Sequence, residues 1–81
     1  MTITVKLFAA MRDLAGSDTE TVELPDGATV AELRRELGKL LPIARTLLSR
    51  SAVAVNHNTV DNDCPLLTND EVAVIPPVSG G

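Results

Sequence analysis

The residues best suited to chemistry stand at the end of the chain, in the run Pro76-Pro77-Val78-Ser79-Gly80-Gly81. Glycine has no side chain, so a terminal pair of glycines can enter a slot that any other residue would block. The α-carboxylate of Gly81 is therefore a chemical handle on a thin tether. Six extended residues at ~3.3 Å each span roughly 20 Å, which is enough to bury this end inside a partner. Pro76 and Pro77 stiffen the tether and lower the entropy lost on insertion.

Other candidate groups favour ordinary structural roles. His57 stands between two asparagines in a predicted turn, where a solvated side chain is expected. Cys64 has no histidine nearby in the sequence, so a small, part-buried side chain fits it better than a nucleophile. Asp61 and Asp63 are spaced like half of a calcium loop, but the glycine and bidentate glutamate that complete such a loop do not follow. The sequence predicts no metal site, no bound cofactor and no active site inside the domain.

Length and composition define a small globular chain. Its 81 residues allow one domain, and 44% hydrophobic with 22% charged residues suits a folded protein. The net charge is −4 and there is no basic run, so we expect no nucleic acid partner. The apolar runs are too short for a membrane span, and the first residues read as a strand rather than a signal peptide. A lone Cys64 leaves no internal disulfide and favours the cytoplasm.

Alternating apolar residues predict the strands. Ile3, Val5 and Leu7 share one face of a strand over 2–9, and a second alternating run covers 19–24 as its hairpin partner. Further strands are expected over 52–55, 59–60 and 71–75. Asn56-His57-Asn58 and Thr68-Asn69-Asp70 provide turns between them, with Asn69 suited to positive φ.

One strong helix is predicted after the Pro25-Asp26-Gly27 turn. Thr29 and Glu32 have the spacing of a capping box, and an apolar stripe follows on one helical face. The stripe consists of Val30, Leu33, Leu37, Leu40 and Leu41. Shorter helical segments are expected over 10–16 and 43–50. This order predicts an α+β fold of the β-grasp, ubiquitin-like type over 1–75, in which one main helix covers a mixed sheet and the first and last strands are central and parallel. We expect residues 76–81 to form a flexible tail.

Several stretches together resemble the MoaD-type sulfur carriers of the MoaD/ThiS family, the small subunits of molybdopterin synthase. The stretches are Val5-Lys6-Leu7-Phe8-Ala9, Arg12-Asp13, Ala15-Gly16, Val53-Ala54-Val55-Asn56, Asp70-Glu71-Val72-Ala73 and the last six residues. The tail is the most specific part of this resemblance, which spans nearly the whole chain. Asn69 departs from the glycine that the family usually has there, and Val74-Ile75 stands where aromatic residues are common.

The resemblance implies a function at Gly81. An E1-like adenylating enzyme of the MoeB type would use ATP to adenylate this residue, and sulfur transfer would then leave a thiocarboxylate. The tail would enter a MoaE-type large subunit, with two large subunits in a heterotetramer. Two rounds of sulfur donation would convert cyclic pyranopterin monophosphate to the dithiolene of molybdopterin. The chain itself would be a sulfur donor, with the catalytic residues on the large subunit.

Docking requires a surface beside the tail. If the first and last strands are neighbours, Phe8 and Ile75 can form one apolar patch, with Arg12 and Glu71 as rim contacts. The alternative for the two apolar residues is burial in the core, and for the two charged residues simple solvation. Three other functions remain open: a thiamine-type sulfur carrier, a ubiquitin-like modifier joined to lysines through Gly81, and a binding module without the chemistry.

Overall fold

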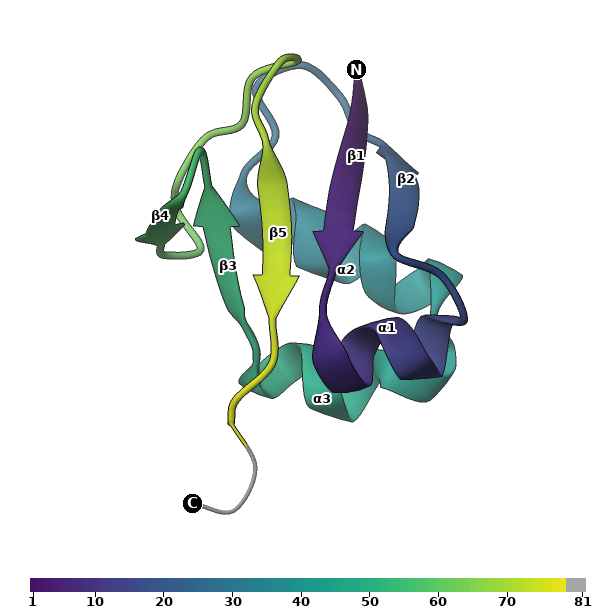
Figure 1. The fold of residues 1–81 in the computed structure, drawn as a ribbon. Helices are drawn as coiled ribbons and strands as arrows, with labels where there is room; N and C mark the ends of the chain where they lie inside the picture. Colours follow the sequence, from purple (N-terminus) through teal and green to yellow (C-terminus); the bar gives the residue numbers. More distant parts are fainter. Residues whose placement is uncertain (79–81) are drawn as a thin grey trace.

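The computed structural model describes residues 1–78, and residues 79–81 lie outside the described part. Within that part, five strands form one mixed sheet in the order β2-β1-β5-β3-β4 (Figure 1). The elements follow one another as β1 (Thr2–Leu7), α1 (Ala9–Ala15), β2 (Thr19–Glu23), α2 (Val30–Leu40), the 3-10 helix η1 (Pro42–Ala44), α3 (Arg45–Arg50), β3 (Ala52–Val55), β4 (Asn58–Val60) and β5 (Val72–Ile75).

The first and last strands lie side by side near the middle of the sheet, as the sequence predicts. β1 pairs with β2 in antiparallel fashion and with β5 in parallel, with Val5 opposite Val72. β5 also pairs with β3, antiparallel, so it is hydrogen-bonded on both edges. Parallel pairing of two strands far apart in the sequence requires a long connection. All the other elements lie in that connection, which confirms the predicted β-grasp arrangement.

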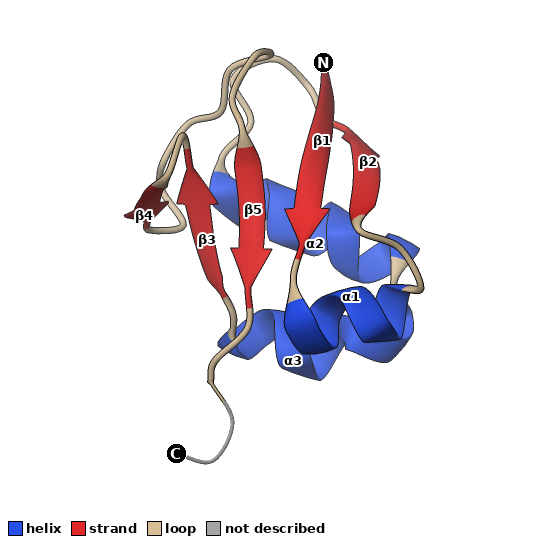
Figure 2. Ribbon diagram, viewed as in Figure 1, coloured by secondary structure: helices blue, strands red, loops and turns tan. Residues whose placement is uncertain are grey.

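Helix α2 covers one face of the sheet and leaves the other face open (Figure 2). Val30, Leu33 and Leu37 of α2 are completely buried in the same core as the inward-facing residues of the strands. The predicted apolar stripe is shorter than expected, because Leu40 is half exposed at the end of the helix. No helix within residues 1–78 has the length and apolar character needed to cross a membrane.

The predicted capping box at the start of α2 is wrong. Thr29 is the N-cap residue, but its side chain makes no capping hydrogen bond. Instead, the backbone N–H groups of Val30 and Ala31 donate to the carbonyl oxygens of Cys64 and Asn62, at 3.0 Å each. A helix leaves its first N–H groups without partners, and here a loop distant in the sequence supplies the acceptors. The loop therefore replaces the local cap.

Positive backbone φ angles mark two turns. The predicted first strand ends at Leu7 instead of Ala9, because Ala9 has φ 50° and turns the chain into α1. Phe8 consequently lies just after β1, as the N-cap residue of α1. In the β3–β4 turn, Asn56 and His57 have φ 52° and 72°, as a tight hairpin turn requires. Asn69 does not have positive φ, contrary to expectation.

Candidate functional site

The C-terminal segment leaves the sheet directly from its central strand. β5 ends at Ile75, which is opposite Ala52 of β3. Pro76 follows, and a proline cannot donate a ladder hydrogen bond, so the strand stops there as predicted. Pro77 and Val78 are exposed, and Val78 is 96% accessible. The predicted reactive residue Gly81 lies outside the described residues, as do Ser79 and Gly80.

A hollow lies on the open face of the sheet, next to the point where the tail departs. We call it the open-face hollow, and it has a volume of about 260 Å³. Its lining consists of the larger side chains Phe8, Ile75, Lys6, Glu71 and His57 and the smaller side chains Ala54, Ala73 and Thr59. The strand register places Ala73 opposite both Lys6 and Ala54. Two neighbouring alanines fill little space above the sheet, and this explains the hollow between the larger side chains.

Phe8 and Ile75 are surface residues. They are 45% and 42% exposed, respectively, so neither belongs to the buried core. Both line the open-face hollow, which joins the end of β1 to the end of β5. Exposed large apolar side chains that line one concave surface are typical of an interaction site. The role of these two residues in binding a partner stays a prediction.

Glu71 is the acidic residue that lines the open-face hollow, and it interacts with two basic side chains there. Its carboxylate lies 3.0 Å from Lys6 Nζ and 2.7 Å from His57 Nε2. The hydrogen bond from Lys6, then the charges of Lys6 and His57, lower the pKa of Glu71. Asn56 holds the backbone of this residue in place: its Oδ1 accepts from Glu71 N at 2.9 Å, and its own N donates to Glu71 O at 2.8 Å.

Arg12 lies apart from the other predicted rim residue. It belongs to a neighbouring hollow of about 300 Å³, which shares Phe8 and Lys6 with the open-face hollow. Its Nε is 3.9 Å from Asp13 Oδ1 and 4.0 Å from Asp18 Oδ1. Phe8 therefore lines a hollow with each of the two predicted charged residues, but Glu71 and Arg12 line different hollows.

Sequence reasoning missed two members of this site. His57 was expected to be a solvated turn residue, and it is 86% exposed, yet it also meets Glu71. Lys6 falls between Val5 and Leu7 in the alternating pattern of the first strand, which predicts no role for it in a site. Neither contact has a local signal in the sequence. Lys6 and Glu71 are 65 positions apart and meet through the parallel pairing of β1 with β5, and His57 meets Glu71 because β3 pairs with β5.

Comparison of the sequence with known proteins identifies one family. Residues 5–81 match the ThiS family. A molybdopterin synthase sulfur carrier subunit from Dictyostelium discoideum is 39% identical over 80 residues, covering 95% of this chain and 93% of the relative. The subunit of the same name from Chlamydomonas reinhardtii is 37% identical over 84 residues, and the alignment covers 100% of both chains.

Solved structures share the fold. The crystal structure of SAMP1 from Haloferax volcanii has a TM-score of 0.89 and 28% identity, and the match covers 100% of both chains. A putative molybdopterin converting factor, subunit 1, from Pyrococcus furiosus has a TM-score of 0.85 and 36% identity, covering 96% of this chain and 99% of that one.

Proposed function

The chain belongs to the ThiS family, and on this premise we propose that it is the sulfur carrier subunit of a molybdopterin synthase. One observation carries the proposal. The family match runs through residue 81, and the Chlamydomonas reinhardtii subunit aligns over the full length of both chains. The similarity therefore includes the glycine tail, where the chemistry is expected. A fold match alone would not support a specific function.

The proposed chemistry takes place at the carboxylate of Gly81. A carboxylate is a poor electrophile, so an E1-like enzyme first joins it to the α-phosphate of ATP, and pyrophosphate leaves. Hydrosulfide released by the sulfur source then attacks the acyl carbon and displaces AMP, which leaves a thiocarboxylate. When the thiocarboxylate donates its sulfur to cyclic pyranopterin monophosphate, water supplies the oxygen that restores the carboxylate, and two rounds supply the two dithiolene sulfurs. A lone thiol such as Cys64 is compatible with the reducing cytoplasm, where we place this cycle.

The open-face hollow is the proposed docking surface for the large subunit of the synthase. Ile75 lines the hollow and is the last residue of β5, so the docking surface and the base of the tail adjoin each other. Phe8 and Ile75 would supply the buried apolar contact, with Glu71 and Arg12 at the rim. A partner held at this surface can receive the tail while the globular body stays outside. The assembly is proposed to be a heterotetramer with two large subunits.

Intact-mass measurement tests the sulfur chemistry. The chain is incubated with the activating enzyme, ATP and a sulfur source, and we expect a mass gain of one sulfur for one oxygen. Addition of the large subunit and the pterin precursor should restore the original mass. The matched control lacks Gly80 and Gly81 and should fold normally but accept no sulfur. Normal sulfur transfer by this shortened chain would refute the proposal.

A ubiquitin-like protein modifier is the second candidate. It is favoured by the TM-score of 0.89 with SAMP1, a protein that a second solved structure calls small archaeal modifier protein 1. Both functions begin with adenylation of Gly81, but a modifier transfers its acyl group to a lysine amine. Mass spectrometry of proteins from cells that express the tagged chain would distinguish them. Isopeptide bonds to lysine, without thiocarboxylate formation, would favour the modifier.

A further inference from the structure

Basic residues are concentrated in a groove between α2 and α3. The chain has seven Lys and Arg residues against eleven Asp and Glu, yet four of the seven line this one groove. We call it the basic groove; its volume is about 570 Å³, and it contains no acidic residue among the described residues that line it. Its main members are Arg34, Arg35, Lys39, Arg45, Leu48 and Asn62.

Arg34 holds the groove together without being neutralised. Its Nε donates to Asn62 Oδ1 at 2.8 Å, Nη1 donates to Leu48 O at 2.8 Å, and Nη2 donates to Ser51 O at 2.9 Å. All three acceptors are uncharged, so the guanidinium keeps its full charge. The two carbonyls lie at the end of α3, where the helix dipole favours a cation. Burial lowers the pKa of Arg34, as expected for a cation with no carboxylate partner.

The other three cations are available to a ligand to different degrees. Arg45 donates from Nε to Gly38 O at 3.1 Å, which leaves its two terminal nitrogens without a hydrogen bond in the described structure. Lys39 pairs with Glu36 at 3.0 Å, an exposed contact that contributes little. Arg35 has no hydrogen bond or ion pair within residues 1–78. Arg35 and Lys39 also stand four residues apart on one helix, where like charges repel.

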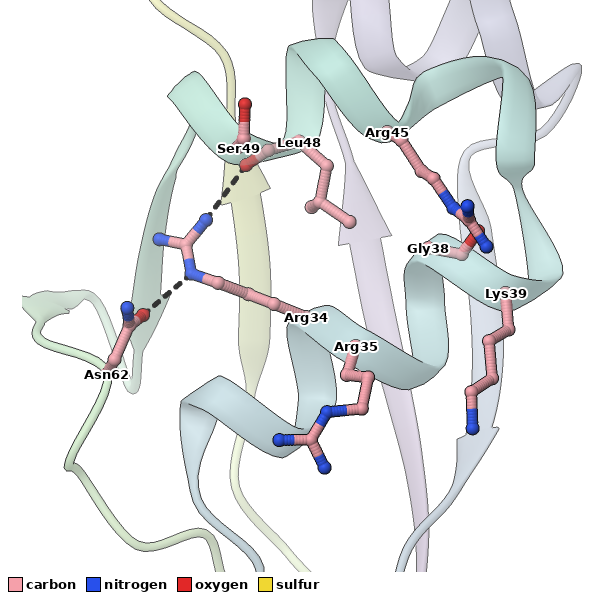
Figure 3. Close-up of a pocket in the computed structure, with 8 residues that line it drawn as sticks. All are labelled: Arg34, Arg35, Gly38, Lys39, Arg45, Leu48, Ser49 and Asn62. Carbon is pink, nitrogen blue, oxygen red and sulfur yellow. Dashed lines mark hydrogen bonds between the residues drawn. The ribbon is translucent and has the colours of Figure 1, made fainter.

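The arrangement of these charges favours an extended acidic ligand. Figure 3 shows Arg34 and Arg45 reaching between α2 and α3 on either side of Leu48, while Arg35 and Lys39 project away from α3. The four groups do not converge on one point, as a single phosphate would require. Four helical residues rise ~6 Å, and alternate residues of an extended strand are separated by ~6.7 Å. Carboxylates on alternate residues of a peptide therefore match the Arg35–Lys39 spacing.

We propose that the basic groove binds an acidic segment of a partner protein. Arginine matches the geometry of a carboxylate, and a positive groove on an acidic chain attracts such a segment. A nucleic acid backbone fits poorly, because its phosphates would continue onto the acidic remainder of the surface. The groove is formed by α2, on the covered side of the sheet, so it is separate from the open-face hollow (Figure 1). Binding there does not depend on the sulfur chemistry of the tail, and each can fail without the other.

The test uses a synthetic peptide in which glutamate alternates with serine. Nuclear magnetic resonance titration of the full chain in about 50 mM salt, where surface charges are weakly screened, should give saturable shifts in the amides of residues 34–49. The Arg35→Glu/Lys39→Glu variant should weaken the affinity about tenfold, as expected for two exposed ion pairs. The milder Arg35→Gln/Lys39→Gln variant should weaken it less. Both substituted positions are exposed, and thermal melting checks that each variant is folded.

The control variant changes the charge equally at two other positions. Arg12→Glu/Arg50→Glu removes two arginines that do not line the groove, so it should leave the peptide affinity nearly unchanged. Equal losses of peptide affinity in the two charge-reversed variants would show that only the overall charge of the chain matters, and this would overturn the proposal. Absence of saturable binding, or shifts located elsewhere, would also overturn it. Tighter binding of inorganic phosphate than of the peptide would identify a small-anion site and refute the acidic segment.

Discussion

Replacement of Phe8 by alanine should weaken binding to the proposed partner, the large subunit of the synthase, while the chain stays folded. Phe8 is 45% exposed in the free chain and lines the open-face hollow. A phenylalanine contributes about 200 Å² of surface, so roughly 90 Å² would become buried in the complex. At ~25 cal/mol per Å², this area is worth about 2 kcal/mol, or about a thirtyfold change in Kd.

The folded state should tolerate this substitution. A fully buried phenylalanine costs about 3–5 kcal/mol when it is truncated to alanine. Phe8 is only partly buried and lies outside the core cluster, so we expect a loss of about 2 kcal/mol in the free energy of unfolding. A small domain with the ordinary stability of about 5–15 kcal/mol stays folded after such a loss. Urea unfolding provides this measurement.

Isothermal titration calorimetry with the large subunit measures the affinity. The matched control is Ile43→Ala, which truncates an apolar side chain that is 73% exposed and lies in η1, outside the open-face hollow. Its Kd should change by less than about threefold, as is usual for a surface substitution. A folded Phe8→Ala chain that binds like the unsubstituted chain would refute the docking surface. An equal loss of affinity in the Ile43→Ala chain would refute the location of the docking surface at the open-face hollow.

The remaining predictions concern local structure. Ala9→Gly should raise the free energy of unfolding by about 1 kcal/mol, because Ala9 has φ 50° and glycine adopts that angle without strain; a decrease in a urea titration would contradict this. Thr29→Ala should cost less than the ~1 kcal/mol usual for an N-cap residue, since its hydroxyl makes no cap; a full loss would show that the hydroxyl matters. Lys6→Gln should raise the pKa of Glu71, because the largest cause of the lowered pKa is the hydrogen bond from Lys6. The carbon-13 resonance of the Glu71 carboxylate, recorded as a function of pH, measures this pKa. Glu71 has a lowered folded-state pKa, so its contribution to stability exists above its unfolded-state pKa and disappears as the pH falls through the folded-state pKa. The Lys6→Gln chain should therefore lose less stability over that pH range. An unchanged pKa of Glu71 in this chain would show that Lys6 does not cause the lowered pKa.

Local patterns predicted most of the elements. Alternation of Ile3, Val5 and Leu7 with polar residues indicated a half-buried strand, and Leu33 and Leu37 indicated the inner face of α2. These patterns work because side-chain direction follows a period of two in a strand and 3.6 in a helix. The strand order then left few compact arrangements, and the β-grasp fold was predicted correctly.

Errors occurred where distant segments replaced local partners. Thr29 and Glu32 have the spacing of a capping box, but the loop that contains Cys64 supplies the acceptors for the helix. The alternating pattern likewise extended the first strand past Leu7, although the backbone at Ala9 turns into α1. A sequence pattern describes neighbours along the chain, and it does not describe which other segment packs against them.

The sequence by itself determined the terminal glycines, the alternating apolar residues of the strands and the apolar stripe of α2. These features depend only on residue types and on the spacing of residues that are close together in the sequence. Only the tertiary structure decided that Phe8 and Ile75 are exposed around one hollow, that Glu71 contacts Lys6 and His57, and that four of the seven basic residues line the basic groove. Those contacts depend on strand register and on the packing of α2 against α3, so they exist only after distant parts of the chain have come together.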